Sequence, residues 1–159
     1  MRGAMLRETV DLCAVLTGSP EWQDARDLRY AVFFAVHHLP YSVMDDRHEA
    51  GAFHLVAKEG ERVVGYGRLA GLGSGRYEIS QMVVDPGHQR KGIGRSLLDS
   101  LLRRADQAGA GEITLNARVG AVPFYERAGF IQSGGCFLSQ TTGVPHVPMR
   151  KRLNRKGQP

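Results

Sequence analysis

The sequence predicts an α/β (α+β) fold, in which a mixed, mostly antiparallel sheet is flanked by helices. The first observation is a strand–helix–strand unit over residues 77–117, whose two strands should lie parallel with a right-handed crossover. The second is that other strands, such as 53–58 and 62–70, are joined by short turns and should pair antiparallel. The length of 159 residues fits one domain. We assign that domain to residues 1–153 and expect residues 154–159 to form a disordered basic tail.

The first third of the chain contains one strand and one long helix. The loose alternation of residues 8–16 predicts the strand. Apolar residues at helical spacing predict a helix over residues 21–36, which residues 19–20 (Ser-Pro) begin as N-cap and first position. Pro40 marks its end. The acidic, aperiodic residues 41–52 predict a loop or a short helix.

The remaining elements follow from the same two periodicities. They are, in order, strands at 53–58, 62–70 and 77–84, a helix at 93–108, a strand at 112–117, a short helix at 120–128, and strands at 130–138 and 146–152. A glycine-rich turn at 71–75 precedes the third strand of this series. Gly109 and Gly129 end the two helices.

Composition narrows the class of protein. No apolar run approaches the ~20 residues of a membrane span, and charged residues interrupt the first apolar patch, so we expect a cytoplasmic protein without a membrane anchor. Cys13 and Cys136 are too few for a disulfide framework, and the six histidines form no metal set. The net charge of +5 owes much to residues 150–152 and 155–156. Neither an aromatic platform nor a recognition helix accompanies these cations, so nucleic-acid binding ranks last among the functions considered.

The stretch VVDPGHQRKGIGR, residues 83–95, has the composition of an anion site. A helix N-terminus presents unpaired N–H groups, and glycines allow phosphate oxygens to approach them closely. Gly92-Ile93-Gly94 surrounds the predicted helix start, and Gln89, Arg90, Lys91 and Arg95 add donors and positive charge. The P-loop pattern fails here because no Lys-Ser/Thr follows Gly92. Residues 65–70 match G-x-G-x-x-A but lack the following helix of a dinucleotide fold, so we interpret their glycines as strand glycines.

Several blocks of the sequence resemble the GNAT acyltransferase superfamily. Residues 89–94 (QRKGIG) match its Q/R-x-x-G-x-G/A signature, after a strand ending in Val-Asp-Pro and before an amphipathic helix. Residues 115–118 (LNAR) and 121–130 (AVPFYERAGF) resemble the second block of the family, which ends in Y-x-x-x-G-F. Residues 29–33 (RYAVF) and 143–146 (GVPH) resemble the ElaA-like branch. The motifs occur in order at the family's spacing over nearly the whole domain.

The resemblance implies a GNAT fold with acetyl-CoA as co-substrate and its pyrophosphate on residues 89–94. It also implies that the strand ending at 82–84 splays from its parallel neighbour at 112–117. Backbone groups of Met82, Val83 and Val84 would then pair with the pantetheine arm, which Asn116 would also reach. A splayed pair leaves N–H and C=O groups that need partners, and the N–H of Val83 or Val84 would polarise the thioester carbonyl.

The resemblance also suggests catalytic groups. Tyr125 occupies the family's tyrosine position, where a phenol protonates the departing thiolate; the alternative is a packing tyrosine. Strand alternation places Glu78, Ser80 and Met82 on one face. Because related enzymes often carry a glutamate at the position of Ser80, Glu78 is expected either to act as base through a water held by Ser80 or to be a solvated strand end.

The acceptor side is the least defined. His38 and His146 are candidate substrate-binding residues, and the carboxylates at 45–49 near the expected mouth would suit a cationic acceptor. We therefore expect an N-acetyltransferase that moves acetyl to a primary amine, from a small molecule or a peptide, by direct attack in a ternary complex. The alternative is a catalytically weak CoA-binding sensor or interaction module. Homodimers are common in the superfamily, but the sequence specifies no interface.

Overall fold

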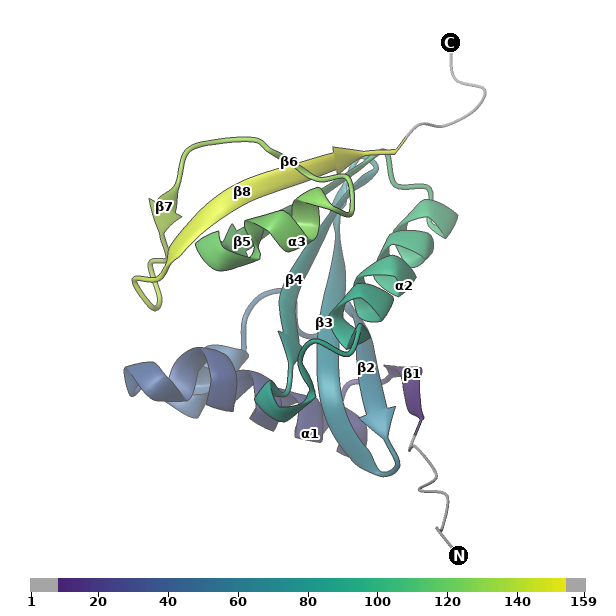
Figure 1. Cartoon of the computed structure of the whole chain (residues 1–159), viewed down its shortest axis with the longest axis vertical. Coiled ribbons are helices and arrows are strands. Elements are labelled where there is room, and N and C mark those ends of the chain that lie inside the picture. Colours follow the sequence, from purple (N-terminus) through teal and green to yellow (C-terminus); the bar gives the residue numbers. More distant parts are fainter. Residues whose placement is uncertain (1–8, 154–159) are drawn as a thin grey trace, which may run out of the picture.

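The computed structural model describes residues 9–153. Its strands form one mixed sheet in the order β1-β2-β3-β4-β5-β8-β6, and β7 also pairs with β8 (Figure 1). The strands are β1 Val10–Val15, β2 Phe53–Glu59, β3 Arg62–Gly73, β4 Arg76–Val84, β5 Glu112–Arg118, β6 Ile131–Gln132, β7 Phe137–Leu138 and β8 Pro145–Arg152. The α-helices are α1 Pro20–Arg29, α2 Ile93–Gln107 and α3 Val122–Glu126. The predicted fold class, a mostly antiparallel sheet with one parallel pair, is confirmed.

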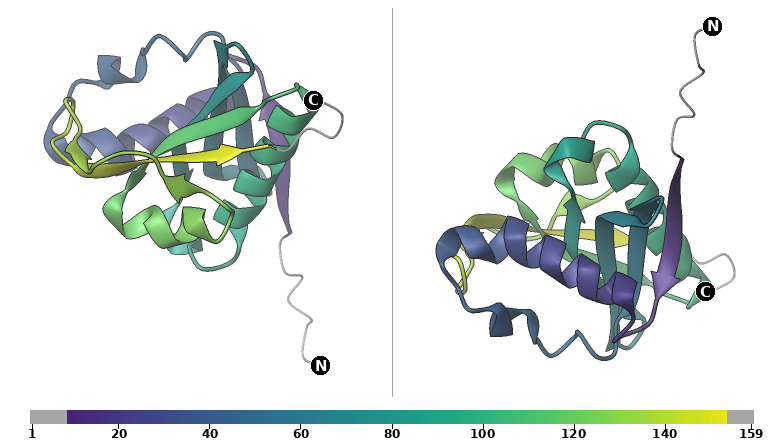
Figure 2. Two further views of the ribbon diagram at one scale, coloured as in Figure 1. Left: turned by 90° about the horizontal axis from the view of Figure 1, so that it is seen from above. Right: turned by 90° about the horizontal axis from the view of Figure 1, so that it is seen from below.

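Helices cover both faces of the sheet. Figure 2 shows α1 across one face, and α2 with α3 on the other. The larger apolar cluster joins the sheet to α2 and α3 and includes Leu97, Leu101 and Phe130, each at most 2% exposed. The smaller cluster lies under α1 and includes Ala25 and Tyr66. The amphipathic stripe that predicted α2 therefore faces the main core.

The parallel pair is short. Strands β4 and β5 are in register only at Arg76↔Glu112, Tyr77↔Ile113 and Glu78↔Thr114. Beyond this point the two strands diverge, and β5 pairs instead with β8 along its whole length (Figure 1). The predicted splay is confirmed, and it leaves the second half of β4 facing a gap in the sheet.

The helix expected over residues 21–36 is interrupted. Ser19 caps α1 as predicted, since its Oγ accepts a hydrogen bond from the Trp22 N–H. However, α1 ends at Arg29, and a π-helical turn, Tyr30–Phe34, and a 3-10 turn, Ala35–His37, follow it. The apolar spacing cannot distinguish these turns from α-helix, because they differ by about one residue per turn. Two further 3-10 turns are Tyr41–Met44 and Pro86–His88, and a last one is Val119–Ala121.

Two predicted strands differ in extent from those observed. Strand β3 continues to Gly73, so the glycine-rich turn is shorter than expected. The strand expected at 130–138 is only the two short strands β6 and β7, separated by a segment that contains Gly134 and Gly135. The cations at 150–152 belong to β8, where Lys151 donates to the Ala128 carbonyl. The predicted tail at 154–159 lies outside the described residues.

Candidate active site

Strand β4 contains a bulge where it leaves β5. Arg68 of β3 pairs with Ser80, but Tyr66 pairs with Val83, so two residues of β4 face the single residue Gly67. Gln81, inside the bulge, has a φ of 58°, a left-handed conformation that is uncommon for a residue other than glycine. Such strain recurs at functional sites.

The bulge changes which side chains share a face. Ser80 points to the α1 side, where it meets Arg68, and Val83 joins the cluster under α1. Met82 instead packs with the cluster on the α2 side. The prediction that Met82 shares a face with Glu78 and Ser80 is wrong, because the extra residue reverses the alternation. Gly67 makes room for this arrangement, since a Cβ there would lie 2.5 Å from Met82 Sδ.

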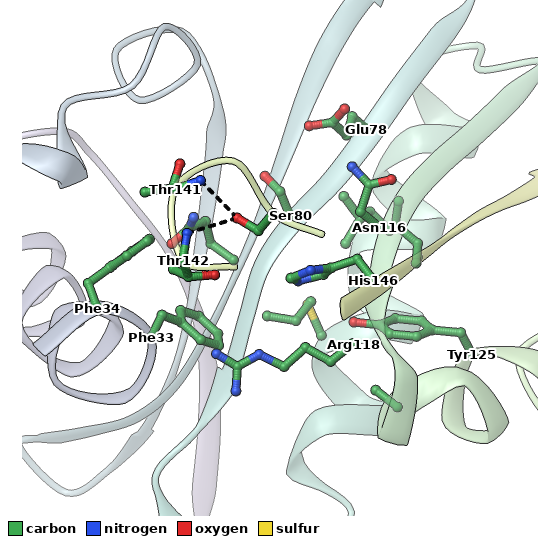
Figure 3. Close-up of a pocket in the computed structure, with 16 residues that line it drawn as sticks. Phe33, Phe34, Glu78, Ser80, Asn116, Arg118, Tyr125, Thr141, Thr142 and His146 are labelled. Atoms are coloured by element: carbon green, nitrogen blue, oxygen red, sulfur yellow. Dashed lines mark hydrogen bonds between the residues drawn. The ribbon is translucent and has the colours of Figure 1, made fainter. Parts of the chain in front are cut away.

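Two cavities meet at the splayed strands. One, the α2 groove, has a volume of about 600 Å³ and runs from Met82 along the start of α2. The other, the β4–β5 cavity, has a volume of about 300 Å³ and opens between the diverging strands (Figure 3). Met82, Ala121 and Tyr125 line both. Tyr125 therefore stands where the two spaces join.

Most of the predicted coenzyme residues line the α2 groove. These are Met82, Val83, Val84, Gln89, Arg90, Gly92, Ile93, Gly94, Arg95 and Tyr125. Lys91 is exposed and does not line it, and Asn116 lines the β4–β5 cavity instead. His88, Phe124 and Arg127 also border the groove, although the sequence did not mark them as binding residues.

The start of α2 fits an anionic group. Gly92 is the N-cap with φ 80°, and no side chain of the described part caps this helix end. A Cβ on Gly92 would meet no protein atom, so its backbone conformation accounts for the glycine. Arg90 has φ 63°, again left-handed. The resulting turn exposes backbone N–H groups at the positive end of the helix dipole, beside the cations Arg90 and Arg95.

His88 ties this turn to the sheet. Its Nδ1 lies 2.8 Å from Asp85 Oδ2 and its Nε2 lies 3.2 Å from Glu59 Oε1. The hydrogen bonds to Asp85 and then to Glu59 raise the pKa of His88. The ring thus holds the segment that carries the glycine-rich turn.

Tyr125 is a buried phenol that faces the cavities. Its ring packs edge-on against Phe124 and Phe130, with centroids 5.0 and 5.9 Å away. Burial raises the pKa of Tyr125 to about 12. The phenol therefore keeps its proton at neutral pH and is able to donate it.

His146 projects from β8 into the β4–β5 cavity (Figure 3). Its Nδ1 lies 2.8 Å from the Val144 carbonyl oxygen, and its ring stacks on Phe137. Because a carbonyl only accepts hydrogen bonds, Nδ1 carries a proton, which leaves Nε2 as the ring nitrogen that is able to accept one. His146 thus lines the β4–β5 cavity, and its predicted role in substrate binding stays a prediction.

The other predicted residues divide into two groups. Glu78 and Ser80 line the β4–β5 cavity, and Ser80 Oγ accepts a hydrogen bond from Arg68 Nε at 3.0 Å. His38 is exposed, ends the 3-10 turn with φ 57°, and lines neither cavity. The π-helical turn places Phe33 and Phe34 at the cavity wall instead.

The carboxylates at 45–49 do not form an acidic mouth. Glu49 is 5% exposed and binds the Arg29 guanidinium at 2.7 and 3.0 Å. Arg68 Nη1 is 2.8 Å from Glu49, and Asp46 also pairs with Arg68. Asp45 pairs with Arg26, and none of the three carboxylates lines either cavity. The sequence argument for a cationic acceptor therefore loses its support, because arginines neutralise these groups.

Comparison with known proteins identifies the family. The family model described as "Acetyltransferase (GNAT) domain" matches residues 22–153. The chain belongs to the GNAT acetyltransferase family. It is 32% identical over 130 residues to the uncharacterized N-acetyltransferase YjcF of Bacillus subtilis, covering 81% of this chain and 91% of that protein.

Solved structures share the GNAT fold. Escherichia coli ElaA superposes with a TM-score of 0.78 at 18% identity, covering 91% of this chain and 100% of ElaA. An aminoglycoside 6′-N-acetyltransferase complexed with coenzyme A has a TM-score of 0.74 at 14% identity, covering 93% of this chain and 99% of that one. Membership of the GNAT family supports acyl transfer from coenzyme A to an amine. Within residues 9–153, no helix has the length and apolar character to cross a bilayer, and no three potential metal ligands gather.

Proposed function

We propose that this GNAT protein transfers the acetyl group of acetyl-CoA to a primary amine by direct attack within a ternary complex. The observation that carries the proposal is the position of Tyr125 at the junction of the two cavities. A coenzyme in the α2 groove and an amine in the β4–β5 cavity would meet beside its phenol.

The α2 groove would hold the coenzyme. Its pyrophosphate fits the N–H groups around Gly92 and Gly94, with Arg90 and Arg95 nearby. The gap beyond Glu78 leaves an edge of β4 that a pantetheine arm is able to follow. A Cβ on Gly94 would lie 3.6 Å from both Phe124 and Val84, an ordinary contact, so packing of the protein alone does not require this glycine. Space for the coenzyme explains it better.

The reaction needs three groups. The amine nitrogen bonds to the acetyl carbon, the C–S bond breaks, and the electron pair leaves on sulfur as a thiolate. A backbone N–H of Val83 or Val84 would stabilise the oxyanion, and Tyr125 would protonate the thiolate. We assign the attacking amine's proton to Nε2 of His146, directly or through one water, because its lone pair is held in the cavity. Glu78, with a water on Ser80, is the alternative base.

The test is the release of free coenzyme A thiol from acetyl-CoA in the presence of amines. Tyr125→Phe should lower kcat by about 100-fold or more, while acetyl-CoA affinity stays close to that of the unmodified protein. Tyr77→Phe is the matched control, because Tyr77 packs against the α2-side cluster and lines neither cavity. Unchanged kcat in Tyr125→Phe would remove the phenol from the mechanism.

The same assay separates the alternative function. Ser80 stands where related enzymes often have a carboxylate, which favours a CoA-binding sensor. Tight acetyl-CoA binding without thiol release for any amine would support that alternative. A cytoplasmic location and a homodimeric assembly stay predictions from the sequence.

A further inference from the structure

We propose that the acceptor amine also carries a carboxylate, which Arg118 binds, so that the substrate class is an amino acid rather than a polyamine. This inference rests on the proposed acetyl transfer and specifies its acceptor. It starts from a residue that neither the coenzyme motif nor the catalytic assignment uses.

Arg118 is the last residue of β5 and lines the β4–β5 cavity. Its guanidinium carbon lies 4.8 Å from the centroid of the Phe33 ring, so the aromatic face supports the cation. It has no ion pair within the described part of the chain. Three buried arginines elsewhere differ in this respect, because Arg26 and Arg29 of α1 and Arg68 of β3 all pair with carboxylates.

The charges of the cavity are balanced rather than acidic. Among its lining residues, Glu78 is the carboxylate and Arg118 the permanent cation. In Figure 3 these two groups lie on opposite sides of the His146 ring. Within residues 9–153 this guanidinium has no ion-pair partner, so a polycation would meet an uncompensated positive charge here, whereas a molecule with one amine and one carboxylate would place its carboxylate on Arg118.

The guanidinium suits a carboxylate geometrically. Its planar donors are able to form two parallel hydrogen bonds to one carboxylate, and contact with the Phe33 ring helps to hold the guanidinium at the cavity wall. With the carboxylate held there, the amine is directed toward the region between His146 and Tyr125, where the α2 groove opens. The volume of about 300 Å³ is at the small end of ligand pockets, which favours a small molecule.

Arg118 is also distinct from the coenzyme site. It does not line the α2 groove, whose cations are Arg90, Arg95 and Arg127. Removing the Arg118 guanidinium should therefore change the KM for the acceptor without changing the KM for acetyl-CoA. A purely structural role for Arg118 would not separate the two constants in this way.

The experiment measures thiol release with each of the common L-amino acids and with amines of the same skeleton that lack the carboxylate. Two such pairs are L-phenylalanine with 2-phenylethylamine and L-ornithine with 1,4-diaminobutane. O-phosphoethanolamine and ethanolamine form a further arm, which distinguishes a phosphate from a carboxylate. We expect the amino acid to have the higher kcat/KM of its pair. Arg118→Gln should raise its KM by about 10- to 100-fold and leave the KM for acetyl-CoA unchanged.

Two further variants complete the design. Arg118→Lys keeps the charge but not the paired donors and should recover part of the affinity. Arg103→Gln, on the exposed face of α2 and away from both cavities, should change neither constant. Equal or better turnover of the amines without a carboxylate, or a preference for O-phosphoethanolamine, would overturn this inference but leave the proposed acetyl transfer intact. Absence of thiol release with every compound would overturn the proposed acetyl transfer, and this inference with it.

Discussion

Replacing Glu49 by glutamine should destabilise the fold strongly, because Glu49 is the carboxylate shared by two buried arginines. It accepts hydrogen bonds from Arg29 and Arg68, and Trp22 Nε1 donates to it at 3.0 Å. Arg29 is fully buried and Arg68 is 2% exposed. Glutamine keeps the shape of the side chain but leaves Arg29 without its ion-pair partner.

Two arguments give the expected loss of unfolding free energy in Glu49→Gln. Burial alone would raise the pKa of Glu49, but hydrogen bonds and charge from Arg29, and then charge from Arg68, outweigh burial and lower it from 4.5 to about 2. At about 1.4 kcal/mol per pKa unit, this corresponds to about 3 kcal/mol. Breaking a buried ion pair from one side typically costs about 3–5 kcal/mol. We therefore expect a loss of about 3 kcal/mol, or about 6–12 °C in Tm for a chain of this size.

The same interaction predicts a pH dependence. Because the pKa of Glu49 is lower in the folded state, its ionisation stabilises the fold fully above about pH 4.5 and progressively less as pH falls toward 2. The difference in unfolding free energy between the unmodified protein and Glu49→Gln should shrink over that window.

Urea unfolding at neutral pH and thermal unfolding over a pH series measure both effects. Glu61→Gln is the control, because the Glu61 carboxylate is solvent-exposed and lies 4.0 Å from Lys58. An exposed pair of this kind contributes at most about 1 kcal/mol. A Glu49→Gln protein as stable as Glu61→Gln at neutral pH would refute the reasoning.

Three further predictions concern the turn, the bulge and the phenol. Gly92→Asp should weaken acetyl-CoA binding by about 100-fold in calorimetric titrations, because a carboxylate would face the pyrophosphate. Gly92→Asn, whose side chain is neutral and which also tolerates a positive φ, should weaken binding much less. Equal losses of affinity in the two variants would mean that the backbone, and not the charge, is responsible. Gly67→Ala should lower the free energy of unfolding in urea by about 1–3 kcal/mol, because the added Cβ would lie 2.5 Å from Met82 Sδ and 2.8 Å from Leu101 Cδ1. An unchanged urea midpoint would show that the bulge adjusts to the extra carbon without strain. Burial raises the pKa of Tyr125 to about 12, so the rate of thiol release at saturating acceptor should not decline between about pH 7 and 10. A decline that is absent in Tyr125→Phe would contradict a protonated phenol over this range.

The sequence predicted the parts of the fold that local patterns determine. The unit β4–α2–β5 was correctly placed, because alternation, an apolar stripe and paired glycines each lie within a short window. Gly92 and Gly94, which predicted an anion site from the sequence, line the α2 groove. The GNAT resemblance added the splay of β4 from β5.

Features that depend on distant contacts were missed. The bulge at Gln81 depends on Gly67 of the neighbouring strand, which gives Met82 its space. Alternation alone therefore placed Met82 on the wrong face. The π-helical turn after Arg29 covers only five residues, which is too short for its apolar spacing to be distinguished from that of an α-helix. The sequence therefore did not identify Phe33 as a wall of the cavity.

Charges were misjudged for the same reason. The carboxylates near residue 49 looked free in the sequence, but Arg29 and Arg68, 20 and 19 residues away in the chain, neutralise Glu49. Arg118, in contrast, gave no signal beyond its place in the LNAR segment. The absence of an ion-pair partner for Arg118 among residues 9–153 becomes visible only when the neighbouring strands are assembled.

Calorimetric titration of the protein with acetyl-CoA, beside ATP at the same salt concentration, tests the central claim most directly. ATP offers phosphates and an adenine but no pantetheine arm, so it matches the charge of the ligand without its length. We predict one acetyl-CoA site per chain, with an affinity well above that for ATP. Absence of acetyl-CoA binding, or equal affinity for ATP, would contradict the assignment of the α2 groove and of the reaction that depends on it.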